Sequence, residues 1–284
     1  MEKNSYVNRT YKDALFKKVF KDKQAILNLY NAIRKTHYTN AEAVHVNTID
    51  RVVFLGMEND VSFIIDDILN IYEHQSTQNR NMPIRGLLYL AELYKDYIRE
   101  NELDIYGNQR IQLPKPIYLV FYNGTEEQPD YEEIYLKDAF RETELPYSDF
   151  LDFKAVMLNI NYGHNKELME RCRPLKEYAI FVDMIRKNLD RGMKIQQAAH
   201  KTVEKCLKKG ILKDILLKEK GEIEDMITIC YDEELHKRRE AEYHEEVGEH
   251  RANLKIALWM KQKGMTKEEI KEATELELDE IEKL

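Results

Sequence analysis

Apolar residues return at helical spacing in the first part of the chain and gather into short runs after it. Residues 10–35 predict one helix, capped by Thr10, because apolar side chains recur every three or four positions. The apolar positions of this predicted helix are Leu15, Val19, Ile26, Leu29, Tyr30 and Ile33. Three short apolar runs then predict strands at 52–56 (VVFLG), 60–65 and 68–75.

The last two of these strands set up the main candidate site. Side chains alternate across a strand, so Glu73 and Gln75 point to one face. Asp60 joins them there if the two strands pair as a hairpin through Asp66 and Asp67, a weaker turn than Asp-Gly. Two carboxylates and an amide would then share one sheet face, which suits a hard divalent cation held over a phosphodiester.

The middle of the chain predicts a helix and two further strands. Pro83 suits the first turn of a helix over 83–99. The inward positions of this helix are predicted to be Ile84, Leu87, Leu88, Ala91 and Tyr94. The continuous apolar run at 116–124 (PIYLVFYNG) predicts a buried strand, and 151–163 predicts one more. Residues 125–153 have the composition of irregular structure.

After residue 165 the β signals stop and the pattern is helical. One long charged helix is expected over 232–264, and Thr266 with Glu269 has the spacing of a capping box at the start of a short terminal helix. Breaks between helices are predicted near Pro174, Gly192, Gly210 and Gly221.

This order of elements indicates an α/β fold, with a central mixed β-sheet flanked by helices and followed by an all-helical C-terminal region. Three parts are expected: a sheet domain at 1–163, a helical extension packing on it at 164–230, and charged C-terminal helices at 231–284. The last part is expected to serve oligomerisation or to form a helix-turn-helix-like tail. Its acidic composition favours self-association over binding in a DNA groove.

Charge is spread unevenly along the 284 residues, whose formal net charge is −8. Residues 1–50 carry nine Lys/Arg and five Asp/Glu, whereas residues 219–250 carry four Lys/Arg and twelve Asp/Glu. The acidic excess therefore lies away from the candidate site, and a local basic surface can still bind phosphate. The net charge excludes non-specific DNA binding by the whole surface.

The cysteines and the hydropathy exclude other classes of protein. Cys172, Cys206 and Cys230 are widely spaced with no CxxC pair, which argues against a disulfide framework or a zinc site and fits a reducing cytosol. No apolar stretch approaches the ~20 residues that span a bilayer, and the first residues lack the apolar segment of a signal peptide. A cytoplasmic protein with no membrane partner is expected.

Longer motifs carry a resemblance to a known family. They include YEHQSTQNRNMPIRGLLYLAELY at 72–94, PIYLVFYNG at 116–124 and LNINYGHN at 158–165, and shorter matches extend over most of the chain. On these segments the chain resembles the recombination-promoting nuclease family, whose members are also labelled transposases and which belongs to the PD-(D/E)xK nuclease superfamily. The EHQST block, with FYNG in register after it, is far more specific than the bare D…ExK pattern.

The resemblance implies a restriction-endonuclease-like fold and a DNA endonuclease that depends on Mg²⁺ or Mn²⁺ and is connected with recombination and mobile elements. Asp60 and Glu73 would be its metal-binding carboxylates, and Gln75 stands where the superfamily more often has Lys. Asp13 matches an acid that supports the site in related nucleases. The backbone carbonyl of His74 is a further candidate ligand.

Several alternatives stay open at this point. Gln75 can orient a water molecule but carries no charge, so the chain is either an active endonuclease or a nuclease-like module that binds DNA or protein without cleaving. Arg85 and Tyr89 share one helix face and are candidates for phosphate contact, with an ion pair to a nearby acid as the alternative for Arg85. Lys17 either tracks a DNA backbone or lies on a solvated helix face. A homodimer would let two active sites cut both strands.

Overall fold

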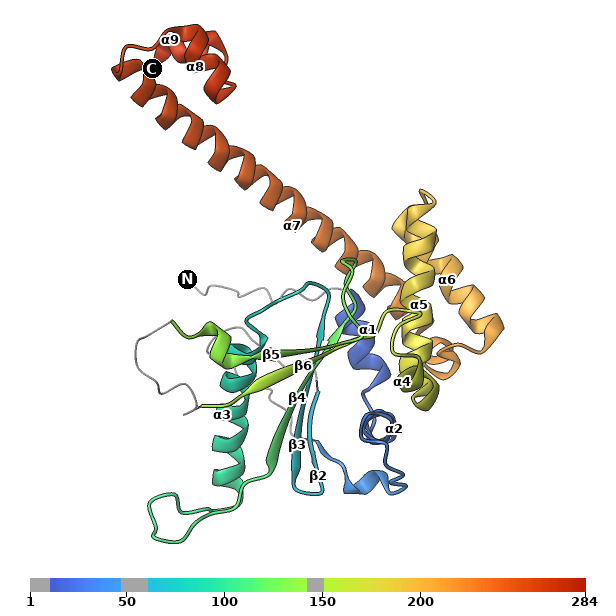
Figure 1. Cartoon of the computed structure of the whole chain (residues 1–284). Helices are drawn as coiled ribbons and strands as arrows, with labels where there is room; N and C mark the ends of the chain where they lie inside the picture. The colour runs from blue at the N-terminus through green and yellow to red at the C-terminus, as the bar shows by residue number, and fades with distance from the viewer. Residues whose placement is uncertain (1–10, 47–60, 142–150) are drawn as a thin grey trace, which may run out of the picture. The chain divides into compact units, whose positions relative to one another are not determined.

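The computed structural model describes residues 11–46, 61–141 and 151–284 (Figure 1). The chain divides into two compact units, Met1–Cys230 and Tyr231–Leu284. The first unit contains the β-sheet and the helices that cover it. The second contains the end of a long helix and two short helices, so the candidate site is a property of the first unit.

Within the described residues, six strands form one sheet in the order β1-β2-β3-β4-β6-β5. The pairs β3–β4 and β4–β6 are parallel, whereas β1–β2, β2–β3 and β5–β6 are antiparallel. This mixed sheet with flanking helices confirms the α/β class. The strands are β1 His45–Val46, β2 Val61–Ile65, β3 Ile68–Gln75, β4 Lys115–Tyr122, β5 Tyr131–Tyr135 and β6 Lys154–Asn159.

The predicted hairpin is confirmed. Strands β2 and β3 pair antiparallel from Val61↔Tyr72 to Ile65↔Ile68. Asp66 and Asp67 have φ of 49° and 56°; short polar side chains tolerate such left-handed positions, which a tight hairpin turn requires. Asp60 lies outside the described residues, so the pairing supports the register that its predicted role needs without describing Asp60 itself.

The predicted first helix is two helices, α1 Tyr11–Val19 and α2 Lys23–Arg34. Asp22 separates them because its side chain accepts a hydrogen bond from the Ala25 amide at 2.8 Å, which caps a new helix. Apolar spacing continues across the break, so the pattern alone missed it. Thr10 and the predicted strand at 52–56 lie outside the described residues.

Helices cover both faces of the sheet (Figure 1). Helix α3, Met82–Glu100, packs on one face through a cluster that includes Leu90, Leu93, Ile71 and Val120. We call this the α3 face. On the opposite face, Phe16 of α1 stacks near Phe121 with ring centroids 5.3 Å apart, and helix α5, Arg173–Asp190, packs beside α1.

Helix α3 is confirmed, and of its predicted inward positions Tyr94 packs against the core, but the predicted face is otherwise wrong. Ile84 and Leu88 are 38% and 42% exposed, and Ala91 is exposed as well. The buried positions are Met82, Pro83, Gly86, Tyr89, Leu90 and Leu93. The helix turns this side inward because Gly86 lets it approach the sheet closely: a Cβ at position 86 would lie 2.3 Å from the ring of Tyr118.

Strand β5 lies in the segment predicted to be irregular. It is an edge strand with the sequence YEEIY, followed by the short 3-10 helix η2, Leu136–Ala139. Charged side chains are common on edge strands, where they oppose pairing with other chains, so charge concealed the strand pattern. The other short 3-10 helix, η1, is Ala41–Ala43.

The helices after the sheet follow the predicted pattern with one shift. Gly192 and Gly210 have positive φ at helix ends, as predicted. In the long helix α7 the backbone departs from helical geometry at Glu219 and not at Gly221. Thr266 and Glu269 form the predicted capping box. These helices are α4 Lys166–Arg171, α5 Arg173–Asp190, α6 Ile195–Lys209, α7 Lys213–Gln262, α8 Lys267–Thr274 and α9 Leu278–Lys283.

In the part of the chain that the structure describes, no helix has both the length and the apolar character needed to cross a membrane.

Candidate functional site

Glu73 is the centre of the candidate site on the α3 face. It is 2% exposed, and its carboxylate accepts hydrogen bonds from the described residues Tyr118, Gln75 and Arg85. The Tyr118 hydroxyl donates to Oε2 at 2.5 Å, and the Gln75 amide donates to Oε1 at 2.9 Å. Arg85 Nη2 also donates to Oε1 and forms an ion pair with it. Strand β3 supplies Glu73 and Gln75, β4 supplies Tyr118, and α3 supplies Arg85.

The electrostatics of this cluster keep Arg85 charged. Burial disfavours the charge on Arg85, but Glu73 and the hydroxyls of Tyr89 and Tyr118 outweigh it, so the pKa of Arg85 is raised. Burial raises the pKa of Tyr118 well above its usual value, and the neighbouring Glu73 carboxylate raises it further. Tyr118 therefore stays protonated and donates to the carboxylate. A buried carboxylate needs such partners, because an unpaired buried charge is costly.

The predicted metal ligands are only partly described. Asp60 lies outside the described residues. The carbonyl of His74 belongs to β3 beyond the last described β2 pair, Val61↔Tyr72. Among the residues that the structure describes, no group of three His, Cys, Asp or Glu side chains could hold a metal ion. Glu73 is thus the one predicted metal-binding carboxylate that the structure describes, and the described residues do not complete a metal site around it.

Asp13 and His74 lie together on the opposite face of the sheet from Glu73. His74 is fully buried, and its Nδ1 is hydrogen-bonded to Oδ1 of Asp13. Its Nε2 lies 2.8 Å from the Tyr178 hydroxyl, which also donates to the Lys12 carbonyl at 3.2 Å. These contacts join α1, β3 and α5. The structure thus separates Asp13 from Glu73, although the sequence analysis grouped them.

The three candidate phosphate contacts have different surroundings. Arg85 forms the ion pair that was its alternative, with Glu73 as the acid, and its side chain is 27% exposed. Tyr89 is 0% exposed, and its hydroxyl accepts from Arg85 Nη2 at 3.1 Å, so the structure places it in the core beneath the site. Lys17 is partly buried on α1.

Sequence reasoning missed Tyr118 and a second charged pair on the α3 face. Tyr118, Val120 and Tyr122 alternate along β4 toward α3, but the continuous apolar run conceals the alternation. Sheet register places Glu73, Val120, Met157 and Glu132 in one row across four strands. Glu132 pairs with Arg80 and lies roughly 14 Å from Glu73 by strand spacing. Glu132 can therefore serve as the control for substitutions of Glu73, because it is a paired carboxylate on the same face.

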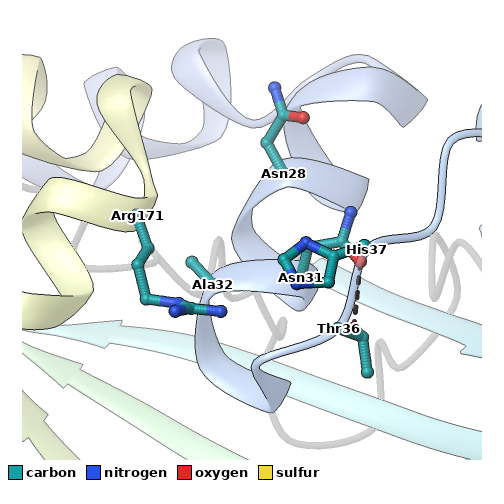
Figure 2. A pocket seen from close by; sticks show the side chains of 6 residues that line it. All are labelled: Asn28, Asn31, Ala32, Thr36, His37 and Arg171. Carbon is teal, nitrogen blue, oxygen red and sulfur yellow. Dashed lines mark hydrogen bonds between the residues drawn. The ribbon is translucent and has the colours of Figure 1, made fainter.

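A pocket of about 340 Å³ opens between the end of α2, the loop after it and α4 (Figure 2). Polar side chains in its lining form hydrogen bonds that hold the loop after α2. Asn31 Oδ1 accepts hydrogen bonds from the Thr36 hydroxyl and the Tyr38 backbone amide, each at 2.9 Å. No member of the Glu73 cluster lines it, so it is not part of the candidate site. Its lining residues are Asn28, Asn31, Ala32, Thr36, His37 and Arg171.

Comparisons with protein families, with curated proteins and with solved structures find no match to this chain. The geometry of the site and the sequence motifs therefore carry the functional argument.

Proposed function

We propose that this chain is a metal-dependent DNA endonuclease of the PD-(D/E)xK type, linked to recombination or mobile elements. The observation that carries the proposal is the buried Glu73 carboxylate at the end of the β2–β3 hairpin, with Gln75 on the same face 2.9 Å away. The ExQ motif predicted this placement. A carboxylate this deeply buried requires surrounding donors, and such sites are frequently functional.

The residues around Glu73 suit it to a catalytic role. Tyr118 and Arg85 donate hydrogen bonds to the carboxylate and fix its orientation. Arg85 is partly exposed, so a phosphate group that approached the cluster would meet a guanidinium able to bind it. Gln75 has an uncharged amide that orients a neighbour but adds no positive charge. In this proposal Glu73 is the essential carboxylate and Arg85 contributes charge neutralisation.

The proposed dependence on Mg²⁺ or Mn²⁺ rests on Asp60 as the second carboxylate, because Glu132, the other described carboxylate in this row, lies roughly 14 Å from Glu73 by strand spacing and pairs with Arg80. Asp13, which faces His74, enters the proposal as a residue that positions strand β3.

One observation favours an alternative function. Oε1 of Glu73 is already in an ion pair with Arg85, and Gln75 lacks the charge that Lys would bring. In a nuclease-like module that binds DNA or a protein partner without cleaving, the ion pair between Glu73 and Arg85 would stay intact, because Glu73 would not need to bind a metal ion.

Nicking of supercoiled plasmid by the full chain with Mg²⁺ tests the proposal. Glu73→Gln and Asp60→Ala are each expected to lower the rate at least about 100-fold, and EDTA to abolish it. The matched control is Glu132→Gln, which neutralises a carboxylate in the same row and on the same face. It is expected to leave nicking unchanged.

Each variant is first checked for folding by circular dichroism and thermal unfolding. Nicking that persists in folded Glu73→Gln contradicts the proposal. A folded wild-type protein that binds DNA but does not nick it supports the alternative.

A further inference from the structure

Arg186 of α5 is held at the carboxyl ends of the parallel strands by uncharged oxygens. Its Nη1 donates to Oδ1 of Asn161 at 2.5 Å. Its Nη2 donates to the carbonyl and to Oδ1 of Asn123, at 2.6 Å and 2.8 Å. Asn123 follows β4 directly and is 1% exposed, and Asn161 lies two positions after β6. The guanidinium is therefore fixed in place by the ends of two strands.

No carboxylate among the described residues lies within ion-pair distance of Arg186, although the side chain is partly buried. Lys187, the next residue along α5, pairs with Asp183 at 2.7 Å, so acids are within reach of this helix. A partly desolvated cation without a counter-charge is unfavourable, and a bound anion would remove that cost. A guanidinium has five N–H donors, and the three contacts leave two for a ligand.

The ammonium group of Lys12 lies close to the same carbonyl oxygen that Arg186 contacts. Nζ of buried Lys12 donates to the carbonyl of Asn123 at 3.4 Å, the same oxygen that Arg186 contacts. The Asn123 amide in turn donates to the carbonyl of Gln75 at 2.8 Å, so β3 ends here as well. In open α/β sheets, ligands bind outside the carboxyl ends of parallel strands.

We propose that Arg186, positioned by Asn123 and Asn161 and supported by Lys12, binds a phosphate group at the carboxyl ends of β3, β4 and β6. The donors that remain on Arg186, Nε–H and one Nη1–H, can each make a single charge-assisted hydrogen bond to a phosphate oxygen, and the charge of Lys12 nearby favours a multiply charged phosphate over the single charge of a carboxylate. The phosphate comes from a nucleic-acid backbone or from a small phosphorylated ligand. Assigning it to DNA rests on the proposed function, whereas the anion site does not.

The test measures binding of inorganic phosphate and pyrophosphate to the full chain by titration calorimetry and by thermal shift. Arg186→Gln removes the charge. Asn123→Asp keeps the oxygen that Arg186 contacts and adds a negative charge between the two cations. Both are expected to lower phosphate affinity at least about tenfold. The matched control, Arg191→Gln, removes an exposed charge at the end of the same helix and is expected to leave affinity unchanged.

The Asn123→Asp variant distinguishes a phosphate-binding role of Arg186 from a purely structural one. If Arg186 serves only to tie α5 to the sheet, the new ion pair retains that tie and leaves phosphate affinity unchanged, which overturns the proposal. Absence of phosphate and pyrophosphate binding by the wild type also overturns it. Retained melting temperature with lost affinity supports it.

Competition by a short oligonucleotide distinguishes the two sources of phosphate. Displacement of pyrophosphate from the wild type by the oligonucleotide, together with direct oligonucleotide binding that is weaker in Arg186→Gln, supports the nucleic-acid backbone. Phosphate binding without such competition supports a small ligand. Nicking is not a readout here. A protein that never nicks DNA can still pass this test, and a nuclease can fail it.

Discussion

Glu73 and His74 are neighbours on one strand, both buried, yet the two faces of β3 that they occupy differ in kind. Glu73 faces α3, where its partner Arg85 has a side chain 27% exposed. His74 faces α1 and α5, where its own side chain is fully buried and joins three elements. In both pairs the partner of the buried group is partly exposed, Arg85 by 27% and Asp13 by 18%, but the α3 face holds an ion pair around a carboxylate, whereas the other face holds a hydrogen-bond network that ties three elements together. Depth of burial alone does not identify a site.

The largest effect is expected from breaking the charge pair on the α3 face. Arg85→Met removes the cation that pairs with the buried Glu73 carboxylate, while the hydrogen bonds from Tyr118 and Gln75 remain. Removing one member of a buried pair costs about 3–5 kcal/mol, and the partial exposure of Arg85 favours the lower end. Urea unfolding monitored by circular dichroism measures the loss.

The double variant Glu73→Gln, Arg85→Met is the control for this prediction. It removes both charges, so it is expected to lose less stability than the sum of the single variants. Additive losses would mean that the pair contributes nothing and that the contrast between the two faces is not electrostatic.

The local part of this arrangement could be predicted from sequence. Alternation places Glu73 and Gln75 on one face, and Asp66 with Asp67 marks the turn between β2 and β3. Both depend on residues close together in the chain. The burial of Glu73 depends on Tyr118, which is 45 positions away in sequence and whose role no local pattern shows.

The placements that the sequence did not show also have a common cause. The aliphatic pattern predicts an inward side of α3 that includes Ile84 and Leu88, but the close approach at Gly86 turns the side with Tyr89 toward the sheet, and Arg85 then reaches Glu73. Asp13 lies on α1 at the face opposite Glu73, so its predicted part in the reaction stays a prediction. In both cases the placement of a side chain depends on contacts between residues far apart in the sequence, and the spacing of apolar positions does not show these contacts.

A smaller effect is expected from glycine substitutions that test how closely α3 approaches the sheet. Gly86→Ala would place a Cβ 2.3 Å from the ring of Tyr118. This clash would displace Tyr118, whose hydroxyl donates a hydrogen bond to Glu73. Such overpacking costs about 1–3 kcal/mol. Gly221→Ala, in a helix with no atom within 4 Å of the added Cβ, is the matched control.

The control is expected to change stability in the opposite direction, by about 1 kcal/mol, because alanine favours a helix over glycine. Thermal unfolding of both variants shows whether Gly86→Ala lowers the melting temperature and Gly221→Ala raises it. A Gly86→Ala protein as stable as the wild type would show that α3 has room to shift and does not fix Tyr118 and Glu73 in place.

The smallest effect is expected on the opposite face and decides whether Asp13 acts in the reaction or only supports β3. Asp13→Asn keeps a side chain that can hydrogen-bond to His74 but removes its charge, so we expect a stability loss of about 1 kcal/mol. Because Asp13 faces away from Glu73, plasmid nicking per folded molecule is expected to stay within about twofold of the wild type. Urea unfolding and nicking are measured on the same preparation, with Glu73→Gln as the reference for a lost catalytic group. A folded Asp13→Asn protein that loses nicking as completely as Glu73→Gln would place Asp13 in the reaction, and the two faces of β3 would then form one functional site in place of a site and its support.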